Sequence, residues 1–67
     1  MGDDMKDYLQ LILDNNININ FNPKTVHVWV ENGKLKSQNN AATIKLSQTE
    51  GCKVKALHLA VDALLGE

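Results

Sequence analysis

Apolar side chains recur at intervals of three and four residues near the start of the chain, which is the spacing of one face of an α-helix. The members of this stripe are Met5, Leu9 and Ile12, with Tyr8 and Leu13 beside them and Leu11 off the stripe. Asp3 or Asp4 is suited to cap the first turn, because a carboxylate accepts hydrogen bonds from free backbone N–H groups at a helix start. The pattern predicts a helix from one of these residues to about Asn15.

Strict alternation of polar and apolar residues follows in segments 17–21, 25–31 and 43–46, and this is the period of a half-buried strand. Between the last two, Asn32-Gly33 predicts a tight hairpin into 34–37, because both residues tolerate a positive φ. That register places Trp29 opposite Lys36 and His27 opposite Gln38, with the valines on the other face. Three strands are expected, or four if 17–21 also pairs.

The segment Ser47-Gln48-Thr49-Glu50 fits a capping box, which predicts a second helix from Ser47 to about Leu65, stopped by Gly66. This helix has two apolar stripes on nearly opposite sides, bridged by Ala60. One comprises Val54, Leu57, Val61, Leu64 and Leu65, and the other comprises Cys52, Ala56, Leu59 and Ala63. The elements predict a single α+β domain over 1–67, with both helices packed on one face of an antiparallel sheet.

Composition narrows the class of protein further. The chain has 67 residues, 43% hydrophobic and 22% charged, with a formal charge of -1 and one cysteine, so a second domain and an internal disulfide are excluded. No apolar run approaches the about 20 residues that a bilayer span needs, and the start Met1-Gly-Asp-Asp lacks the features of a signal peptide. We expect a cytoplasmic protein without membrane contact.

Candidate chemistry is sparse. His27, His58 and Cys52 lie in no nucleophile, metal-ligand or phosphate-loop motif. Cys52 follows Gly51 near a helix start, where a thiol pKa can be lowered, but it also belongs to an apolar stripe, and we interpret it as a packed side chain. We expect no enzymatic activity, no cofactor and no metal.

The outer face of the predicted sheet carries the most distinctive side chains, which are His27, Trp29, Lys36 and Lys45. An exposed tryptophan is a common interface anchor and a stacking platform for nucleobases. The alternative is cross-strand support, with the indole ring lying over the stem of Lys36. All seven basic residues are lysines, and Lys53 and Lys55 at the start of the second helix are candidate phosphate contacts.

The predicted order of a helix, three antiparallel strands and a helix resembles the double-stranded-RNA-binding domain. Residues 51–65 are similar to its last helix: Ala56 and Ala60 match the alanine spacing, Leu65 the closing leucine, and Lys53 one phosphate-binding lysine. Val54 and Leu57 stand where the family has its other lysines, and the Gly-Pro-x-His type loop is missing. The resemblance implies the fold and, through Lys53, contact with duplex RNA. Because the other lysines and the loop of the family are missing, the resemblance supports the fold more than RNA binding.

We hypothesise a non-enzymatic protein-interaction or regulatory module that is homo-oligomeric or binds another protein. Its interface is expected at Cys52, Ala56, Leu59 and Ala63, because a helix with two apolar stripes needs partners on two sides. A small protein of this kind would suit a phage or mobile-element factor. The alternative is a nucleic-acid-binding domain that uses Lys53 and Lys55 or the exposed sheet face.

Overall fold

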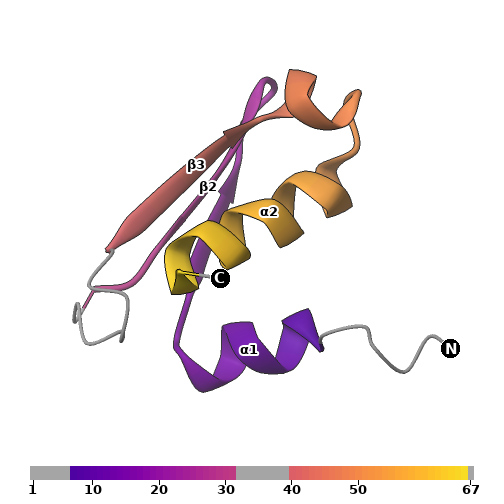
Figure 1. Cartoon of the computed structure of the whole chain (residues 1–67). Coiled ribbons are helices and arrows are strands. Elements are labelled where there is room, and N and C mark those ends of the chain that lie inside the picture. Colours follow the sequence, from indigo (N-terminus) through magenta and orange to yellow (C-terminus); the bar gives the residue numbers. More distant parts are fainter. Residues whose placement is uncertain (1–6, 32–39, 67) are drawn as a thin grey trace, which may run out of the picture.

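The computed structural model describes residues 7–31 and 40–66, which form a helix, a three-stranded sheet and a second helix (Figure 1). In chain order the elements are α1 (Tyr8–Asp14), β1 (Asn18–Phe21), β2 (Thr25–Trp29), β3 (Ala41–Lys45), the 3-10 helix η2 (Leu46–Thr49) and α2 (Lys53–Leu65). Both helices lie on the same side of the sheet, and α2 packs directly on β2 and β3. The predicted α+β class is confirmed.

The sheet is antiparallel throughout, with β2 between β1 and β3. The segment 17–21 therefore contributes a paired strand, which the sequence left open. Trp29 pairs with Asn18 on one side and Ala41 on the other, and His27 pairs with Asn20 and Thr43. The expected pairing of Trp29 with Lys36 is wrong, because both edges of β2 are already occupied. Residues 32–38, including the Asn-Gly turn, lie outside the described residues.

The core lies between the sheet and α2. Val26 and Val28 of β2 are fully buried, and so are the four residues of α2 that face them, Ala56, Ala60, Val61 and Leu64. Ala56 and Ala60 each add only a methyl group to this interface, which allows α2 to pack close to the sheet. Ile44 and Leu46 also point inward, as the alternation predicts.

The second helix begins at Lys53, six positions after the expected start at Ser47. The intervening chain forms η2, whose first turn is closed by the Lys45 N–H donating to Gln48 Oε1 at 3.1 Å. Glu50 and Gly51 then adopt left-handed conformations, with φ of 56° and 82°. A right-handed helix cannot run through two such residues, and this is why the capping-box prediction fails. Gly66 ends α2 with a φ of 79°, as predicted.

The first helix is rotated relative to the prediction. Tyr8, Leu11 and Ile12 pack against the core, whereas Leu9 and Leu13 point away from it. The Asp7 carboxylate caps the helix by accepting from the Gln10 N–H at 3.1 Å; Met5 and the expected caps Asp3 and Asp4 lie outside the described residues. In the described part of the chain, neither helix has the length and apolar character needed to cross a membrane.

Candidate functional site

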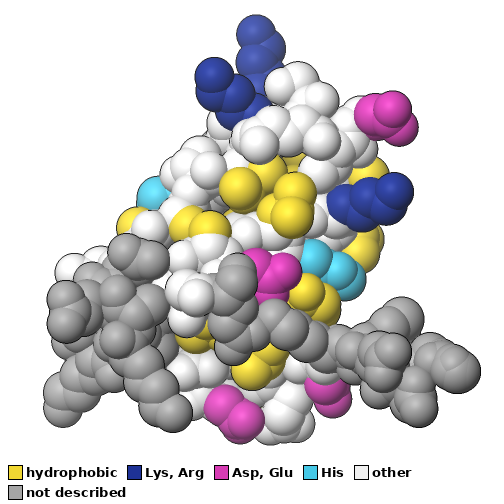
Figure 2. All heavy atoms as spheres, in the orientation of Figure 1, with side chains coloured by type: hydrophobic (Ala, Val, Ile, Leu, Met, Phe, Trp, Pro, Cys, Tyr) yellow, Lys and Arg dark blue, Asp and Glu magenta, His cyan; other side chains and the backbone are white. Residues whose placement is uncertain are grey.

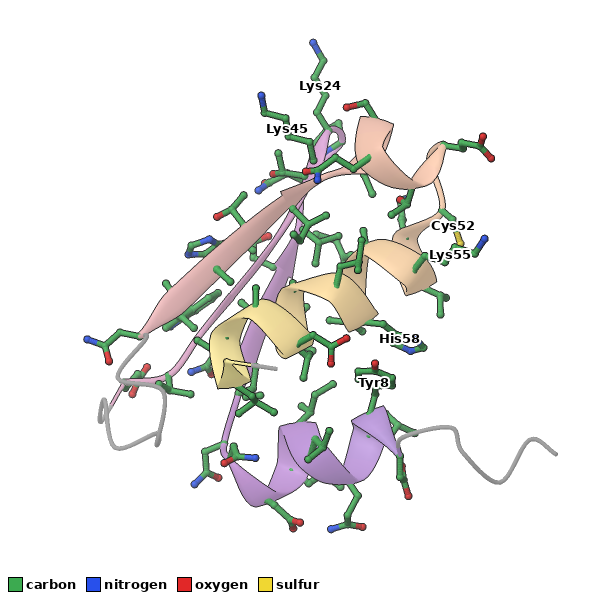
Figure 3. All side chains as sticks on the ribbon, in the orientation of Figure 1. Tyr8, Lys24, Lys45, Cys52, Lys55 and His58 are labelled. Atoms are coloured by element: carbon green, nitrogen blue, oxygen red, sulfur yellow. The ribbon has the colours of Figure 1, made fainter. Side chains whose placement is uncertain are left out.

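Three lysines from separate segments surround one surface hollow of about 650 Å³, which we call the lysine hollow. Lys24 lies in the turn between β1 and β2, Lys45 ends β3, and Lys53 begins α2. The other lining residues are Pro23, Thr25, Leu46, Ser47, Glu50 and Gly51. Lys24 and Lys45 extend side by side from the end of the sheet that is farthest from α1 (Figure 3).

Backbone hydrogen bonds hold the walls of the lysine hollow together. The Asn22 N–H donates to Thr25 O at 2.8 Å and closes the turn that carries Lys24. The Leu46 N–H donates to Lys24 O, also at 2.8 Å, so the start of η2 is fixed beside that turn. The reversal at Glu50 and Gly51 then returns the chain, which places Lys53 at the rim.

The charge of the lysine hollow is concentrated and unpaired. Lys24, Lys45 and Lys53 are all exposed, and none of them forms an ion pair with a described carboxylate. Glu50 is the one acidic residue in the lining. Among the described residues, Asp7 and Asp14 lie at the two ends of α1, and Figure 2 shows acidic side chains at that end of the molecule and basic side chains at the other. Such separation creates a local field that the net charge does not reveal.

A second hollow, of about 430 Å³, lies between α1, η2 and α2. On its wall the Tyr8 ring stacks on His58, with centroids 3.9 Å apart and planes inclined by 6°. The Tyr8 hydroxyl lies 3.0 and 3.2 Å from the two carboxylate oxygens of Asp62 and donates to them. This cluster joins α1 to α2. No such cluster was predicted from the sequence, although His58 and Asp62 are four residues apart and therefore share one face of a helix.

Lys53 and Lys55 do not lie on the same surface. Lys53 lines the lysine hollow, whereas Lys55 lines the second hollow together with His58 and Asp62. Two positions along a helix correspond to about 200° of rotation, so the two side chains diverge. The lysines that line the same hollow as Lys53 are Lys45 and Lys24, of which Lys24 was not expected from the sequence pattern.

His27 and Trp29 occupy the face of the sheet that α2 does not cover, because they alternate with the buried valines of β2. Their rings stack with centroids 5.3 Å apart, and His27 Nδ1 lies 2.6 Å from Thr43 Oγ1. Both side chains are half-buried rather than fully exposed. Lys45 stands at the end of β3, opposite Thr25, and Lys36 lies outside the described residues.

The structure does not place the four residues of the interface expected on α2 on one exposed surface. Ala56 has no exposed surface, because it packs against the sheet, and it cannot contribute to an interface. Leu59 and Ala63 are exposed, and Cys52 is half-buried as a free thiol. The four residues therefore do not form one continuous outer face.

Among the described residues, the large apolar side chains with the greatest exposure lie instead on α1. Leu9 is 74% exposed and Leu13 is 69% exposed, one helical turn apart, and we call them the α1 leucine pair. The sequence pattern placed Leu9 in the apolar stripe and Leu13 beside it. In the structure Tyr8, Leu11 and Ile12 are the partly buried residues that pack against the core, because the Tyr8 contacts with α2 fix the rotation of the helix.

Within residues 7–31 and 40–66, no three His, Cys, Asp or Glu side chains gather so that they could hold a metal ion. Of the two hollows, the lysine hollow is lined by more side chains of one charge. Among the described residues, Leu9 and Leu13 are the most exposed of the large apolar side chains. Comparison with protein-family models, with curated protein sequences and with solved structures finds no match for this chain.

Proposed function

We propose that this chain is a non-enzymatic protein-interaction module whose contact surface is the α1 leucine pair. The observation that carries the proposal is the exposure of Leu9 and Leu13, at 74% and 69%, on adjacent turns of one short helix. Full burial of a leucine is worth about 1.5–3 kcal/mol. A partner groove that covered both side chains would recover most of this free energy, as in other complexes of an amphipathic helix with a groove.

The charges beside the α1 leucine pair indicate the chemistry of the partner. Asp7 and Asp14 stand at the two ends of α1, so an apolar groove rimmed by lysine or arginine would complement it. A second copy of the chain offers lysines at the opposite end of the molecule. We therefore favour a head-to-tail contact between copies over a symmetrical contact between two α1 helices, which would bring four carboxylates together.

Molar mass by light scattering tests this proposal across a range of protein concentrations. Wild-type protein is expected to self-associate, and Leu9→Ser/Leu13→Ser to remain monomeric. Val54→Ser is the matched control, since Val54 is 61% exposed on the other helix. Leu59→Asp examines the α2 surface in the same assay. A wild-type chain that stays monomeric up to its solubility limit would overturn self-association through α1, and so would an association that Leu9→Ser/Leu13→Ser leaves intact.

Nucleic-acid binding is the second candidate, favoured by the helix–three strands–helix order together with the exposed lysines Lys53 and Lys55 at the start of α2. Duplex RNA and duplex DNA would be added separately in the light-scattering experiment. Binding to the RNA duplex that weakens as salt rises would support this candidate. An unchanged mass with both duplexes would exclude it.

A further inference from the structure

We propose that the lysine hollow is a binding site for a phosphomonoester group, such as the terminal phosphate of a nucleotide. The site lies on η2, α2 and the turn between β1 and β2, and it uses no residue of α1. The proposal therefore goes beyond the protein contact assigned to the α1 leucine pair. Because a head-to-tail contact would bring α1 of a second copy to the lysine end of the molecule, phosphate binding is also measured in the Leu9→Ser/Leu13→Ser variant.

The charge of the lining favours a dianion. Lys24, Lys45 and Lys53 together with Glu50 leave a formal charge of +2 around the hollow. A phosphomonoester carries a charge of about −1.5 to −2 at pH 7, whereas a carboxylate or a phosphodiester carries only one negative charge. A phosphomonoester therefore matches the lining most closely.

The start of α2 reaches the same wall through Lys53. Cys52 caps this helix without any side-chain hydrogen bond, and the first intrahelical bond runs from the Ala56 N–H to Cys52 O. The hydroxyls of Ser47 and Thr25 lie on the lining as well. A phosphate seated beside Lys53 would have the side chains of Ser47 and Thr25 on the same lining.

The size and the apolar part of the hollow indicate a ligand larger than free phosphate. Its volume of about 650 Å³ falls within the range of small-molecule sites, and Pro23 and Leu46 give it apolar walls. A nucleoside monophosphate has both a phosphate for the lysines and a flat apolar body for these walls. We therefore expect it to bind more tightly than inorganic phosphate.

The arrangement of the lysines argues against a polynucleotide backbone as the ligand. A duplex is held by several phosphate contacts spread along a groove, whereas these three lysines line a single hollow. The next described lysine, Lys55, lines a different hollow beside Asp62 and Glu50. One phosphate group fits this geometry better than a row of them.

Titration of ¹⁵N-labelled protein, followed by NMR, tests the site with three probes: inorganic phosphate, adenosine 5′-monophosphate and adenosine. The amides of Ser47, Gly51 and Lys53 are expected to shift with both phosphates and not with adenosine. Lys24→Gln and Lys45→Gln should each weaken binding by about five- to tenfold. Lys55→Gln is the matched control, an exposed lysine on the same helix outside the hollow, and should leave the affinity unchanged.

Two results would overturn the proposal: no saturable shift with either phosphate, or a loss of affinity in Lys55→Gln equal to that in Lys24→Gln and Lys45→Gln. The titration is repeated in Leu9→Ser/Leu13→Ser protein to separate it from the proposed function. Binding that persists in this variant supports the phosphate site whatever the oligomeric state. Self-association without phosphate binding would support the protein contact through α1 and contradict the phosphate site.

Discussion

Tyr8 and Asp62 are 54 positions apart in the chain, yet the phenol of the first donates a hydrogen bond to the carboxylate of the second at 3.0 Å. The same ring stacks on His58, which lies one turn before Asp62 on α2. Tyr8 is therefore the side chain that determines which face of α1 meets the rest of the molecule. Its contacts explain why Leu9 and Leu13 are left outside.

Tyr8→Phe is expected to reduce the free energy of unfolding by about 1 kcal/mol, because it removes the hydrogen bond to Asp62 and keeps the ring stack on His58. Thermal unfolding followed by circular dichroism should show a midpoint about 4–8 °C lower. Gln10→Ala is the control, since it removes an exposed hydrogen bond within α1, to Asp14. Equal stability of Tyr8→Phe and wild type would show that the hydroxyl does not hold the helices together.

The two faces of α1 should respond differently to substitution. Leu11→Ser is expected to destabilise the protein by about 1–2 kcal/mol, because Leu11 packs against the core. Leu13→Ser should change the free energy of unfolding by less than about 0.5 kcal/mol, since its side chain is 69% exposed. Urea unfolding at a concentration where the protein is monomeric measures both. The reverse order of the two effects would mean that the stripe expected from the sequence is the correct one.

The close approach of α2 to the sheet predicts that Ala60 tolerates no larger side chain. Ala60→Leu should reduce the free energy of unfolding by about 1–3 kcal/mol, because Ala60 is completely buried and the added atoms would force α2 away from the sheet. Ala63→Leu introduces the same side chain on the exposed surface of the same helix and should be nearly neutral. Urea unfolding of both variants gives the comparison. Two equal losses would indicate a helix-wide effect rather than overpacking.

The turn before α2 makes Gly51 a specific requirement of the backbone. Gly51 has a φ of 82°, so Gly51→Ala is expected to reduce the free energy of unfolding by about 1 kcal/mol, although a Cβ at this position would meet nothing within 4 Å. The loss would therefore come from the backbone conformation alone. Gly51→Asn should cost less, because asparagine adopts left-handed conformations more readily. Chemical unfolding distinguishes the two, and an alanine variant as stable as wild type would contradict the argument.

The parts of the fold that depend on local periodicity could be predicted from the sequence. Alternation along 25–31 identifies Val26 and Val28 as inward residues, because a strand has only two faces. The same rule does not choose a strand's neighbour: Asn32-Gly33 favoured a hairpin with 34–37, but β1 and β3 fill both sides of β2. A turn motif such as Asn-Gly does not show whether another strand pairs with the same edge of β2.

The candidate sites were harder to predict, because they depend on residues that only the fold brings together. The lysine hollow joins positions 24, 45 and 53 through the hydrogen bond between Leu46 and Lys24 and the left-handed turn at Glu50 and Gly51. No spacing in the sequence links these positions. The rotation of α1 was missed for a related reason: hydropathy ranks leucine above tyrosine, whereas the specific ring stack and hydrogen bond of Tyr8 decide the packing.

None of the residues of α1 is fully buried, whereas β2 and α2 each carry completely buried side chains. Detachment of α1 would therefore disrupt less of the core than separation of β2 from α2, so we expect this helix to open first. Its amide protons should exchange with solvent well before those of β2. The element that presents the α1 leucine pair is thus also the one able to rearrange around a partner at the smallest loss of native structure.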